Sequence, residues 1–275
     1  MSIFYWCMGI VSALLFLLIL YFLLLRCRRG HKAFRALRGW GYAHRGLHGG
    51  GVPENSMEAF RLALEGGYGI ELDVHLMADG NLAVIHDASL LRTAGVEVKI
   101  EDLTARDLAD YRLEGTEERI PLFSDVLALF AGKAPMIIEL KAERGNHAAL
   151  AAAVCKLLED YQGDYCLESF DPRVIRWLKK NRPCQCRGQL AENFLRNKKS
   201  KLPWILKFVM TRQLVNFLVV PDFVAFRFQD RHLLGLWITR HLWGAQCVGW
   251  TITSQADYDQ CLKEGWLPIF EGFKP

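Results

Sequence analysis

The chain has 275 residues, enough for one large α/β domain or two small ones. Its hydrophobic content of 51% is ample for a core, and its positive mean hydropathy points to an additional membrane segment. The net charge of +4 comes largely from one local cluster, so the chain lacks the overall charge of a nucleic-acid-binding protein.

The N-terminus carries an apolar run, Ile3–Leu25, without a formal charge. As a helix it would be about 35 Å long, which suffices to cross a hydrocarbon core of about 30 Å. A cleaved signal peptide would need basic residues before the run and small residues after it. Only Met1-Ser2 precedes the run and Arg26-Cys27-Arg28-Arg29 follows it, so residues 1–29 are predicted to be a retained anchor with a basic flank.

Two further observations bear on the compartment. Basic residues continue through a short linker, residues 30–39, as far as Arg38. The positive-inside rule therefore predicts that the large domain, residues 40–275, lies in the cytoplasm. The eight cysteines are scattered irregularly, which fits a reducing compartment because nothing resembles a disulfide framework.

The large domain is expected to open with a short strand, Gly41–His44, that ends in Arg45. A glycine-rich loop follows, in which the backbone can approach a ligand closely. Asn55 or Ser56 is expected to cap a helix that runs from Met57 to about Gly66.

The stretch Gly69–Asp87 organises the rest of the domain. Its alternating apolar residues predict a strand in which Glu71 and Asp73 point to the same side. Asp79-Gly80 is a strong hairpin turn sequence, and Leu82–Ile85 is expected to return along the first strand. Folding about this turn would place His86 roughly opposite Asp73.

Beyond the hairpin, residues 88–120 form a polar stretch that is too long for an ordinary connection, with a short capped helix expected at Leu103–Leu108. Strand and helix patterns then alternate to the end of the chain. Eight parallel strands are expected, beginning near residues 41, 69, 136, 164, 187, 222, 246 and 268. This alternation predicts an α/β fold, a (β/α)8 TIM barrel with an insertion after the second strand. A doubly wound open sheet is the competing architecture.

One segment, Asn193–Val220, has two interpretations. A basic run, Arg196–Lys201, leads into the apolar residues 202–220. A helix here could rest on the bilayer with its basic end on the headgroups. Alternatively, it could be a buried barrel helix that follows a solvated loop.

A barrel places its chemistry at the carboxyl ends of its strands. His44 and Arg45 end the first expected strand, Glu71 and Asp73 lie in the second, and Glu139 and Lys141 lie at the third, with Trp250 near the end of the seventh. Three carboxylates without thiols favour Mg²⁺ or Ca²⁺. His44 and His86 are the candidate acid and base, while His48, His75 and His232 are interpreted as polar caps. Arg45 and Lys141 could bracket a phosphate, so the set predicts phosphoryl transfer to water or to an internal hydroxyl.

The same residues carry a family resemblance. The motifs are AHRG at 43–46, PEN at 53–55, ELDV at 71–74, DG at 79–80, HD at 86–87, IELK at 138–141, ESFDP at 168–172 and WTI at 250–252. In order and spacing they resemble the glycerophosphodiester phosphodiesterases. The resemblance covers about Trp40 to the C-terminus. One departure is Phe270-Glu271-Gly272, because the family usually ends its last strand in a Thr-Asp or Thr-Asn pair.

The resemblance implies a (β/α)8 barrel that binds one divalent cation through the matches of Glu71, Asp73 and Glu139. It implies that the matches of His44 and His86 are general acid and base, and that Arg45 and Lys141 bind phosphate. Glu54 matches a further active-site carboxylate. The implied reaction is hydrolysis of glycerophosphodiesters to sn-glycerol 3-phosphate and an alcohol.

We therefore expect a membrane-anchored, metal-dependent phosphoric diester hydrolase that acts near lipid headgroups. Lysophospholipase D-like hydrolysis of lysophospholipids is the close variant. A catalytically silent membrane scaffold or binding module is the alternative of another class. The sequence does not indicate the headgroup, the choice between Mg²⁺ and Ca²⁺, or the oligomeric state.

Overall fold

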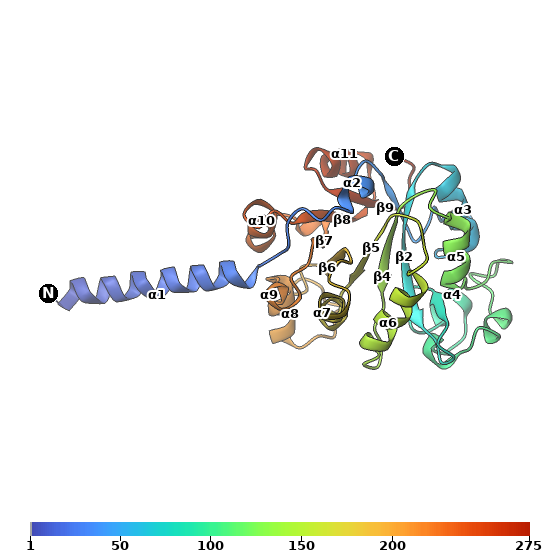
Figure 1. Cartoon of the computed structure of the whole chain (residues 1–275), viewed down its shortest axis with the longest axis horizontal. Helices are drawn as coiled ribbons and strands as arrows, with labels where there is room; N and C mark the ends of the chain where they lie inside the picture. The colour runs from blue at the N-terminus through green and yellow to red at the C-terminus, as the bar shows by residue number, and fades with distance from the viewer. Residues whose placement is uncertain (1) are drawn as a thin grey trace.

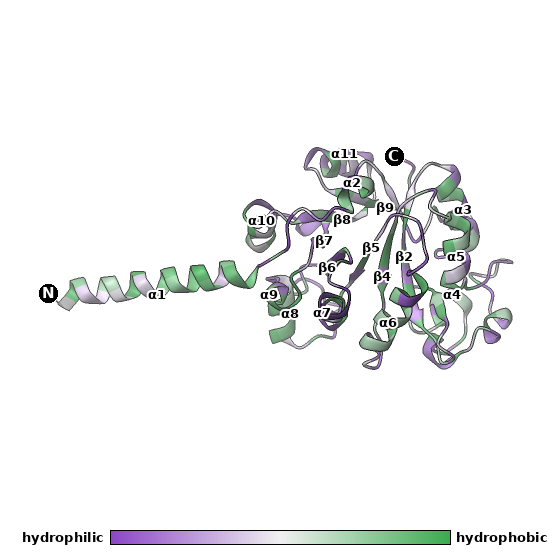
Figure 2. Ribbon diagram, viewed as in Figure 1, coloured by the Kyte–Doolittle hydropathy of each residue, from purple (hydrophilic) through white to green (hydrophobic). Residues whose placement is uncertain are grey.

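The protein consists of a long N-terminal helix and a barrel of strands surrounded by helices (Figure 1). A computed structural model describes residues 2–275. Helix α1 (Ser2–Leu24) projects away from the barrel, and it is apolar along its whole length (Figure 2). Its candidate span, Ile3–Leu24, is long and apolar enough to cross a membrane; residues 3–20 are all exposed, and the last turn is partly buried.

Eight parallel strands close into a barrel, so the predicted TIM-barrel fold is confirmed. The first strand pairs with both the second and the last, Ala43 with Ile70 and with Phe270, which closes the sheet. The barrel strands are β1 (Tyr42–His44), β2 (Gly69–Leu76), β4 (Met136–Leu140), β5 (Tyr165–Ser169), β6 (Arg187–Ala191), β7 (Phe223–Arg227), β8 (Gln246–Ile252) and β9 (Leu267–Phe270).

The remaining strand belongs to the predicted hairpin. Strand β3 (Leu82–Val84) pairs antiparallel with β2, with Val84 opposite Val74. The pairing ends at Val84, so His86 lies in the following loop rather than in the ladder.

Helices cover the outer face of the barrel. They are α3 (Met57–Glu65), α5 (Phe123–Phe130), α6 (His147–Leu157), α7 (Pro172–Asn181), α8 (Trp204–Thr211), α9 (Asn216–Val219), α10 (Leu234–His241) and α11 (Gln255–Lys263). Ser56 caps α3, because its Oγ accepts a hydrogen bond from Ala59 N at 3.1 Å. Helix α6 ends at Leu157, with Leu158 as its C-cap.

The floor of the barrel, where the strands begin, is closed by the segment that follows α1. Phe34 and Leu37 of the short helix α2 (Phe34–Leu37) are buried against interior residues such as Tyr42, Phe223 and Ile269. Arg28 forms an ion pair with Asp222, which precedes β7. Residues 30–39 are therefore packed on the barrel floor, and the domain boundary expected at residue 40 stays a prediction.

The insertion after the second barrel strand has a small apolar core of its own, which includes Leu90, Ile100 and Leu108. It contains β3, α4 (Leu91–Ala94), η1 (Ile100–Asp102) and η2 (Asp107–Asp110). The prediction of a helix at Leu103–Leu108 is wrong. Asp107 Oδ2 accepts hydrogen bonds from Thr104 N and Oγ1 at 2.7 and 2.8 Å, which holds residues 104–107 in a turn, and the 3₁₀ helix begins only at Asp107.

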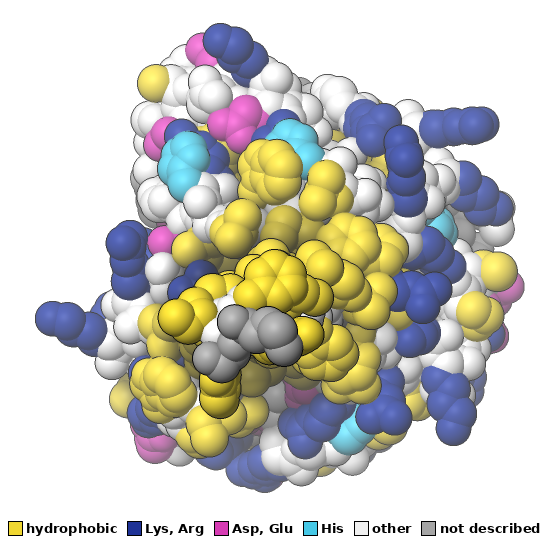
Figure 3. All heavy atoms as spheres, turned by 90° about the vertical axis from the view of Figure 1, so that its left-hand side faces the viewer, with side chains coloured by type: hydrophobic (Ala, Val, Ile, Leu, Met, Phe, Trp, Pro, Cys, Tyr) yellow, Lys and Arg dark blue, Asp and Glu magenta, His cyan; other side chains and the backbone are white. Residues whose placement is uncertain are grey.

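The exposure of helix α8 bears on the two interpretations of residues 193–220, and contact with a bilayer stays a prediction. Trp204 and Ile205 are 68% and 67% exposed, so α8 is not a wholly buried barrel helix. Together with Leu206, Phe208, Phe217, Leu218, Leu234, Trp237 and Leu242 they are the exposed large apolar residues of α8, α9 and the α10 region. In Figure 3, which looks along α1 toward the barrel, apolar side chains form a broad area around α1, with lysine and arginine side chains at its rim.

Candidate active site

Three of the predicted carboxylates converge at the mouth of the barrel, where the strands end. Glu71 and Asp73 project from β2, and Glu139 projects from the paired position on β4, where it is the partner of Asp73. Each contributes an oxygen atom to a group in which all three atoms lie within 4.8 Å of one another. All three residues are buried. The alternation that the sequence predicted for the second strand therefore places both of its carboxylates inside the barrel mouth.

Two cations offset part of this negative charge. Lys141 Nζ lies 3.1 Å from Glu139 Oε1 and 3.4 Å from Asp73 Oδ1. Arg45 Nε lies 3.3 Å from Asp73 Oδ2. Burial alone would raise the pKa of Asp73, but Lys141, His86 and Arg45 hold it well below its usual range.

The other carboxylates are less well compensated. Burial, together with the charges of Asp73 and Glu139, raises the pKa of Glu71 well above its usual range. Burial likewise raises the pKa of Glu139 to about 7. A fourth buried carboxylate, Glu168 of β5, has its pKa raised by burial and by the charge of Glu139, and its Oε2 has no hydrogen-bond partner. Such a set of oxygen donors fits a hard divalent cation, which would satisfy the free oxygen and relieve the repulsion.

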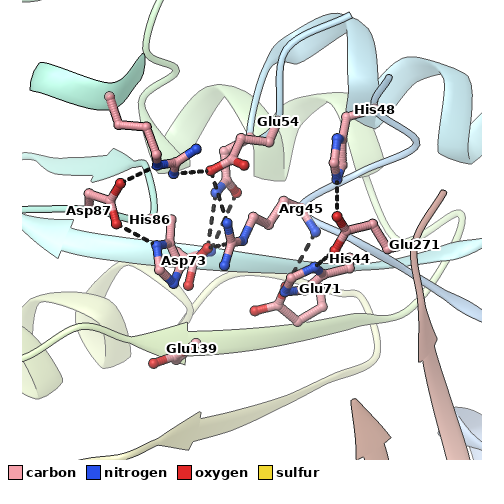
Figure 4. A network of polar contacts seen from close by, with 12 residues as sticks. His44, Arg45, His48, Glu54, Glu71, Asp73, His86, Asp87, Glu139 and Glu271 are labelled. Atoms are coloured by element: carbon pink, nitrogen blue, oxygen red, sulfur yellow. Dashed lines mark hydrogen bonds and ion pairs between the residues drawn. The ribbon is translucent and has the colours of Figure 1, made fainter. Parts of the chain in front are cut away.

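His86 belongs to a chain of charged side chains that runs along one side of the mouth (Figure 4). Its Nδ1 lies 2.8 Å from Asp87 Oδ1. Arg92 of the insertion donates to Asp87 Oδ2 and to Glu54 Oε1, and Glu54 in turn pairs with Arg45 at 3.0 Å. Burial is the main cause that lowers the pKa of His86 to about 4, so the imidazole is neutral at pH 7.

His44 has a carboxylate partner of its own. Its Nδ1 lies 2.5 Å from Glu271 Oε2, and its Nε2 lies 3.8 Å from Glu71 Oε2 (Figure 4). His48 Nε2 lies 3.8 Å from the other oxygen of Glu271. The hydrogen bond from His44 is the main cause that lowers the pKa of Glu271 to about 2. Both predicted catalytic histidines therefore have Nδ1 held by a carboxylate, which leaves Nε2 available for a substrate.

The backbone conformation after β1 positions the loop that carries Arg45. Arg45 and Gly46 both have positive φ, 54° and 81°. A Cβ at Gly46 would lie 2.8 Å from the backbone carbon of Ala59, so only glycine allows the loop to approach α3 this closely. Asn55 also has positive φ, and its side chain donates to Asp73 Oδ2 at 3.0 Å.

A partly open chamber of about 110 Å³ lies at the centre of these groups. Its wall includes His44, Arg45, His86 and Trp250. Trp250 packs edge to face on Phe170, with the ring centroids 5.6 Å apart. The structure thus brings the nine residues expected to form the site to one mouth. Glu54 is connected to the chamber through Arg45, and Lys141 through Asp73. The individual roles of the nine residues stay predictions.

Sequence reasoning assigned no role to several residues of this mouth. Glu271 and Glu168 could have been found from their positions, because each lies at the carboxyl end of a barrel strand. Asp87 follows His86 directly. Arg92 lies in an irregular insertion, and no periodicity indicates where its side chain goes. His75, interpreted as a polar cap, is buried and holds Glu101 of η1 at 2.7 Å.

Comparison with known proteins identifies the family. Residues 44–270 match the model of the glycerophosphoryl diester phosphodiesterase family. The chain belongs to this family. It is therefore a phosphoric diester hydrolase of the glycerophosphodiester phosphodiesterase type, and the alternative of a protein from another class is not supported. Members of this family generally depend on a divalent metal ion, and the acidic group described above could bind one.

Individual relatives agree with the family. A glycerophosphodiester phosphodiesterase from Caldanaerobacter subterraneus subsp. tengcongensis is 28% identical over 236 residues, which are 81% of this chain and 89% of that protein. A lysophospholipase D from Rattus norvegicus is 34% identical over 136 residues, 45% of this chain and 42% of that protein. The match with this second relative therefore spans less than half of its length.

Solved structures share the fold. A glycerophosphodiester phosphodiesterase from Thermotoga maritima aligns with a TM-score of 0.64 at 25% identity over 84% of this chain and 92% of that one. A phosphodiesterase from Oleispira antarctica aligns with a TM-score of 0.71 at 19% identity over 87% of this chain and 94% of that one. That protein was solved in complex with the product sn-glycerol-3-phosphate.

The buried carboxylates generate a prediction about stability. Because the pKa of Glu139 is raised to about 7, its folded form holds a proton that the unfolded form releases near its usual pKa. Stability in chelator should therefore fall as the pH rises from about 5 to 7. Mg²⁺ or Ca²⁺ at a hundred times its dissociation constant should raise the free energy of unfolding at pH 8 by about 2.7 kcal/mol.

The substitution Glu139→Gln should reduce both the pH dependence and the effect of the metal, since it removes one of the repelling charges. Glu143→Gln, at an exposed position in the loop that follows β4, is the matched control and should behave as the wild type. The measurement is thermal unfolding of the full chain across pH, with chelator and with metal. An undiminished metal effect in Glu139→Gln would remove Glu139 from the cation site.

Proposed function

We propose that the enzyme hydrolyses glycerophosphodiesters to sn-glycerol 3-phosphate and an alcohol by histidine acid–base catalysis with one bound divalent cation. The observation that carries this proposal is the position of His44 and His86, which both line the chamber that also contains Glu71 and Glu139. The imidazole of His44 is held by Glu271 and that of His86 by Asp87. Both rings thus face the same small chamber as the carboxylate oxygens that could bind a metal ion.

The cation would be held by Glu71, Asp73 and Glu139. When bound, it would neutralise charge on the phosphate and on the carboxylates around it. The hard oxygen ligands favour Mg²⁺ or Ca²⁺.

The other residues position the substrate. Arg45 and Lys141 are engaged with carboxylates at distances of 3.0–3.4 Å, and a bound cation would free them to contact the phosphate oxygens. Glu54 orients Arg45, and Trp250 forms an apolar side of the chamber.

The reaction needs one proton removed and one supplied. One histidine takes a proton from the nucleophile, which adds to phosphorus, and the other gives a proton to the alcohol oxygen as its bond to phosphorus breaks. In the net reaction water is consumed and the phosphodiester becomes a monoester and an alcohol. The product named for the Oleispira antarctica structure and the name of the Caldanaerobacter relative agree with this reaction class.

The enzyme is further proposed to act at a membrane. Residues 1–29 would form the anchor and its basic flank, 30–39 a linker, and 40–275 the catalytic domain. The charges after the span would place this domain on the cytoplasmic side. The exposed apolar residues of α8, α9 and the α10 region lie around α1 (Figure 3), which supports contact with the bilayer. Hydrolysis of lysophospholipids by the same site is the second candidate, favoured by this surface and by the name of the Rattus norvegicus relative.

A substrate panel tests the reaction. The full chain in lipid nanodiscs is assayed with glycerophosphocholine, glycerophosphoethanolamine, glycerophosphoglycerol and lysophosphatidyl lipids, with chelator, Mg²⁺ or Ca²⁺. We expect release of glycerol phosphate or lysophosphatidic acid with metal, and its loss in chelator, because the repelling carboxylates would then lack their cation. Undiminished release in chelator would contradict the metal requirement, and no release from any substrate would contradict the reaction.

The two histidines are tested by substitution. His44→Ala and His86→Ala should each lower turnover by roughly 10²–10⁴-fold, the range for general acid–base groups. His232→Ala, at an exposed position away from the chamber, should leave turnover unchanged. The measurement is turnover with glycerophosphocholine in the presence of metal. Full activity of either chamber variant, with thermal unfolding as in the wild type, would remove that histidine from the mechanism.

Glu271 is expected to act through His44 as a positioning residue. Glu271→Gln keeps the size of the side chain and removes its charge, so turnover should fall by roughly 10–100-fold, as for other groups that orient a ligating or catalytic histidine. The Michaelis constant should stay nearly unchanged, and the pH profile should shift. His48→Ala is the control, because it removes the other neighbour of Glu271 and leaves the His44 hydrogen bond. A loss of equal size in His48→Ala would point to loop structure instead.

A further inference from the structure

A second cavity lies beside the catalytic chamber, on the outer side of Phe170. It is a groove of about 440 Å³ between the start of α7 and the inner face of α8. Its wall is almost wholly apolar and includes Phe170, Phe194, Leu202, Leu206, Val209 and Met210. The one carboxylate in the wall, Asp171, caps α7 and pairs with Arg173, so it is already satisfied. This volume is in the range of small-molecule sites, and its lining suits a hydrocarbon.

Phe170 joins the groove to the catalytic chamber. It follows β5 directly, and it lines both cavities. One side of its ring meets Trp250 of the chamber, and it also meets Phe194 of the groove, with the centroids 6.1 Å apart. A molecule whose phosphate lies in the chamber can therefore place an apolar portion past Phe170 into the groove. The chamber itself, at about 110 Å³, is too small for a long chain.

The other face of α8 lies toward α1. Phe208 of α8 and Arg212, which follows this helix, line a shallow apolar hollow together with Leu17, Leu20 and Tyr21 in the last turns of α1. Trp243, after α10, packs on the same end of α1, because its Nε1 donates to Phe22 O at 2.9 Å and its ring stacks on Phe22.

The length of α1 places this contact in the membrane. A span of 22 residues is about 33 Å long as a helix, barely more than the hydrocarbon thickness of about 30 Å. Nearly the whole helix is therefore needed to cross the bilayer, so its last turns lie at the edge of the hydrocarbon. Helix α8, whose Phe208 lines a hollow shared with those turns, would lie at the same edge. It thus separates the bilayer on one side from the groove on the other.

We propose that this groove binds the acyl chain of a single-chain phospholipid, which enters from the bilayer along α8 while its phosphate occupies the catalytic chamber. The inference rests on the proposed function and names the substrate class of that same site. A glycerophosphodiester without an acyl chain leaves the groove unused, so the groove determines preference between lipid and water-soluble substrates without taking part in the bond changes.

Two adjacent positions on α8 provide a matched test. Leu206 lines the groove, whereas its neighbour Ile205 is not part of the groove and is 67% exposed. Leu206→Trp would fill part of the groove, and Ile205→Trp would add the same side chain outside it. Since both positions are exposed, neither change disturbs the core. The full chain in nanodiscs is assayed with glycerophosphocholine and with lysophosphatidylcholines of 6 to 16 carbons.

In the wild type, kcat/KM should rise with chain length, by up to about fourfold for each methylene that becomes buried, and then level off. Leu206→Trp should level off at a shorter chain and lose at least tenfold on the longest one. It should hydrolyse glycerophosphocholine at the wild-type rate. Ile205→Trp should match the wild type on every substrate. Each lipid substrate partitions into the bilayer equally for the three proteins, so partitioning cancels when their kcat/KM values are compared as ratios.

The contrary outcomes are distinct. Equal losses in both variants on long chains would mean that α8 acts only through bilayer contact, and unchanged profiles in both would mean that the groove is unused; either overturns the inference. A wild type that hydrolyses glycerophosphocholine but gains nothing from chain length also overturns the inference and leaves the proposed function intact. A wild type that hydrolyses neither substrate overturns the proposed function itself.

A binding measurement removes the dependence on turnover. The His86→Ala variant, in nanodiscs, is photolysed with a lysophosphatidylcholine that carries a diazirine at the end of its acyl chain. Crosslinks should map to Phe194 and to residues 202–215 and should be lost in the double variant with Leu206→Trp. Crosslinks confined to α1 would overturn the proposal.

Discussion

The mouth of this barrel depends on a concentration of negative charge that the protein alone does not fully neutralise. Glu71, Asp73, Glu139 and Glu168 are all buried, and the cations paired with members of this group are Lys141 and Arg45. Charges in such an environment interact strongly, and an uncompensated buried carboxylate tends to take up a proton. The raised pKa values of Glu71, Glu139 and Glu168 follow from this imbalance. Such a site favours the uptake of a proton or the binding of a cation.

This constraint couples the cation to the phosphate. While Arg45 and Lys141 are paired with carboxylates, their positive charges are largely compensated and contribute little to the binding of an anionic substrate. A divalent ion held by the carboxylates would leave Arg45 and Lys141 free to contact the phosphate. Under the proposed mechanism the substrate would then lie between His44 and His86, whose Nδ1 atoms are already held by Glu271 and Asp87. Metal binding and substrate binding are therefore expected to assist each other.

Much of this arrangement could be predicted from local sequence. Period-two alternation placed Glu71 and Asp73 on one side of their strand, Asp79-Gly80 marked the hairpin, and the rule that barrels act at strand ends brought His44 and Glu139 to the same mouth. The residues that were missed have partners far away along the chain. Glu271 meets His44 across 227 positions, and Arg92 meets Glu54 from an insertion without periodicity. Local patterns carry no information about such pairs. Likewise, the composition of α8 fitted both a core helix and a membrane-contacting one, and only its packing shows that one of its faces is exposed.

The way in which α1 is attached to the barrel determines how the exposed position of α8 is interpreted. The chain does not leave α1 through a free tether, because Arg28 is paired with Asp222 and Phe34 and Leu37 close the barrel floor. Trp243 and α8 then hold the last turns of α1 from the side. Under the proposed anchoring, a span fixed at both its end and its flank would set the orientation of the barrel on the bilayer. The side of the barrel that carries α8 would then face the lipid, with the mouth next to it. A substrate that stays partly in the bilayer can then reach the chamber by moving along one helix, without leaving apolar surroundings over its whole length.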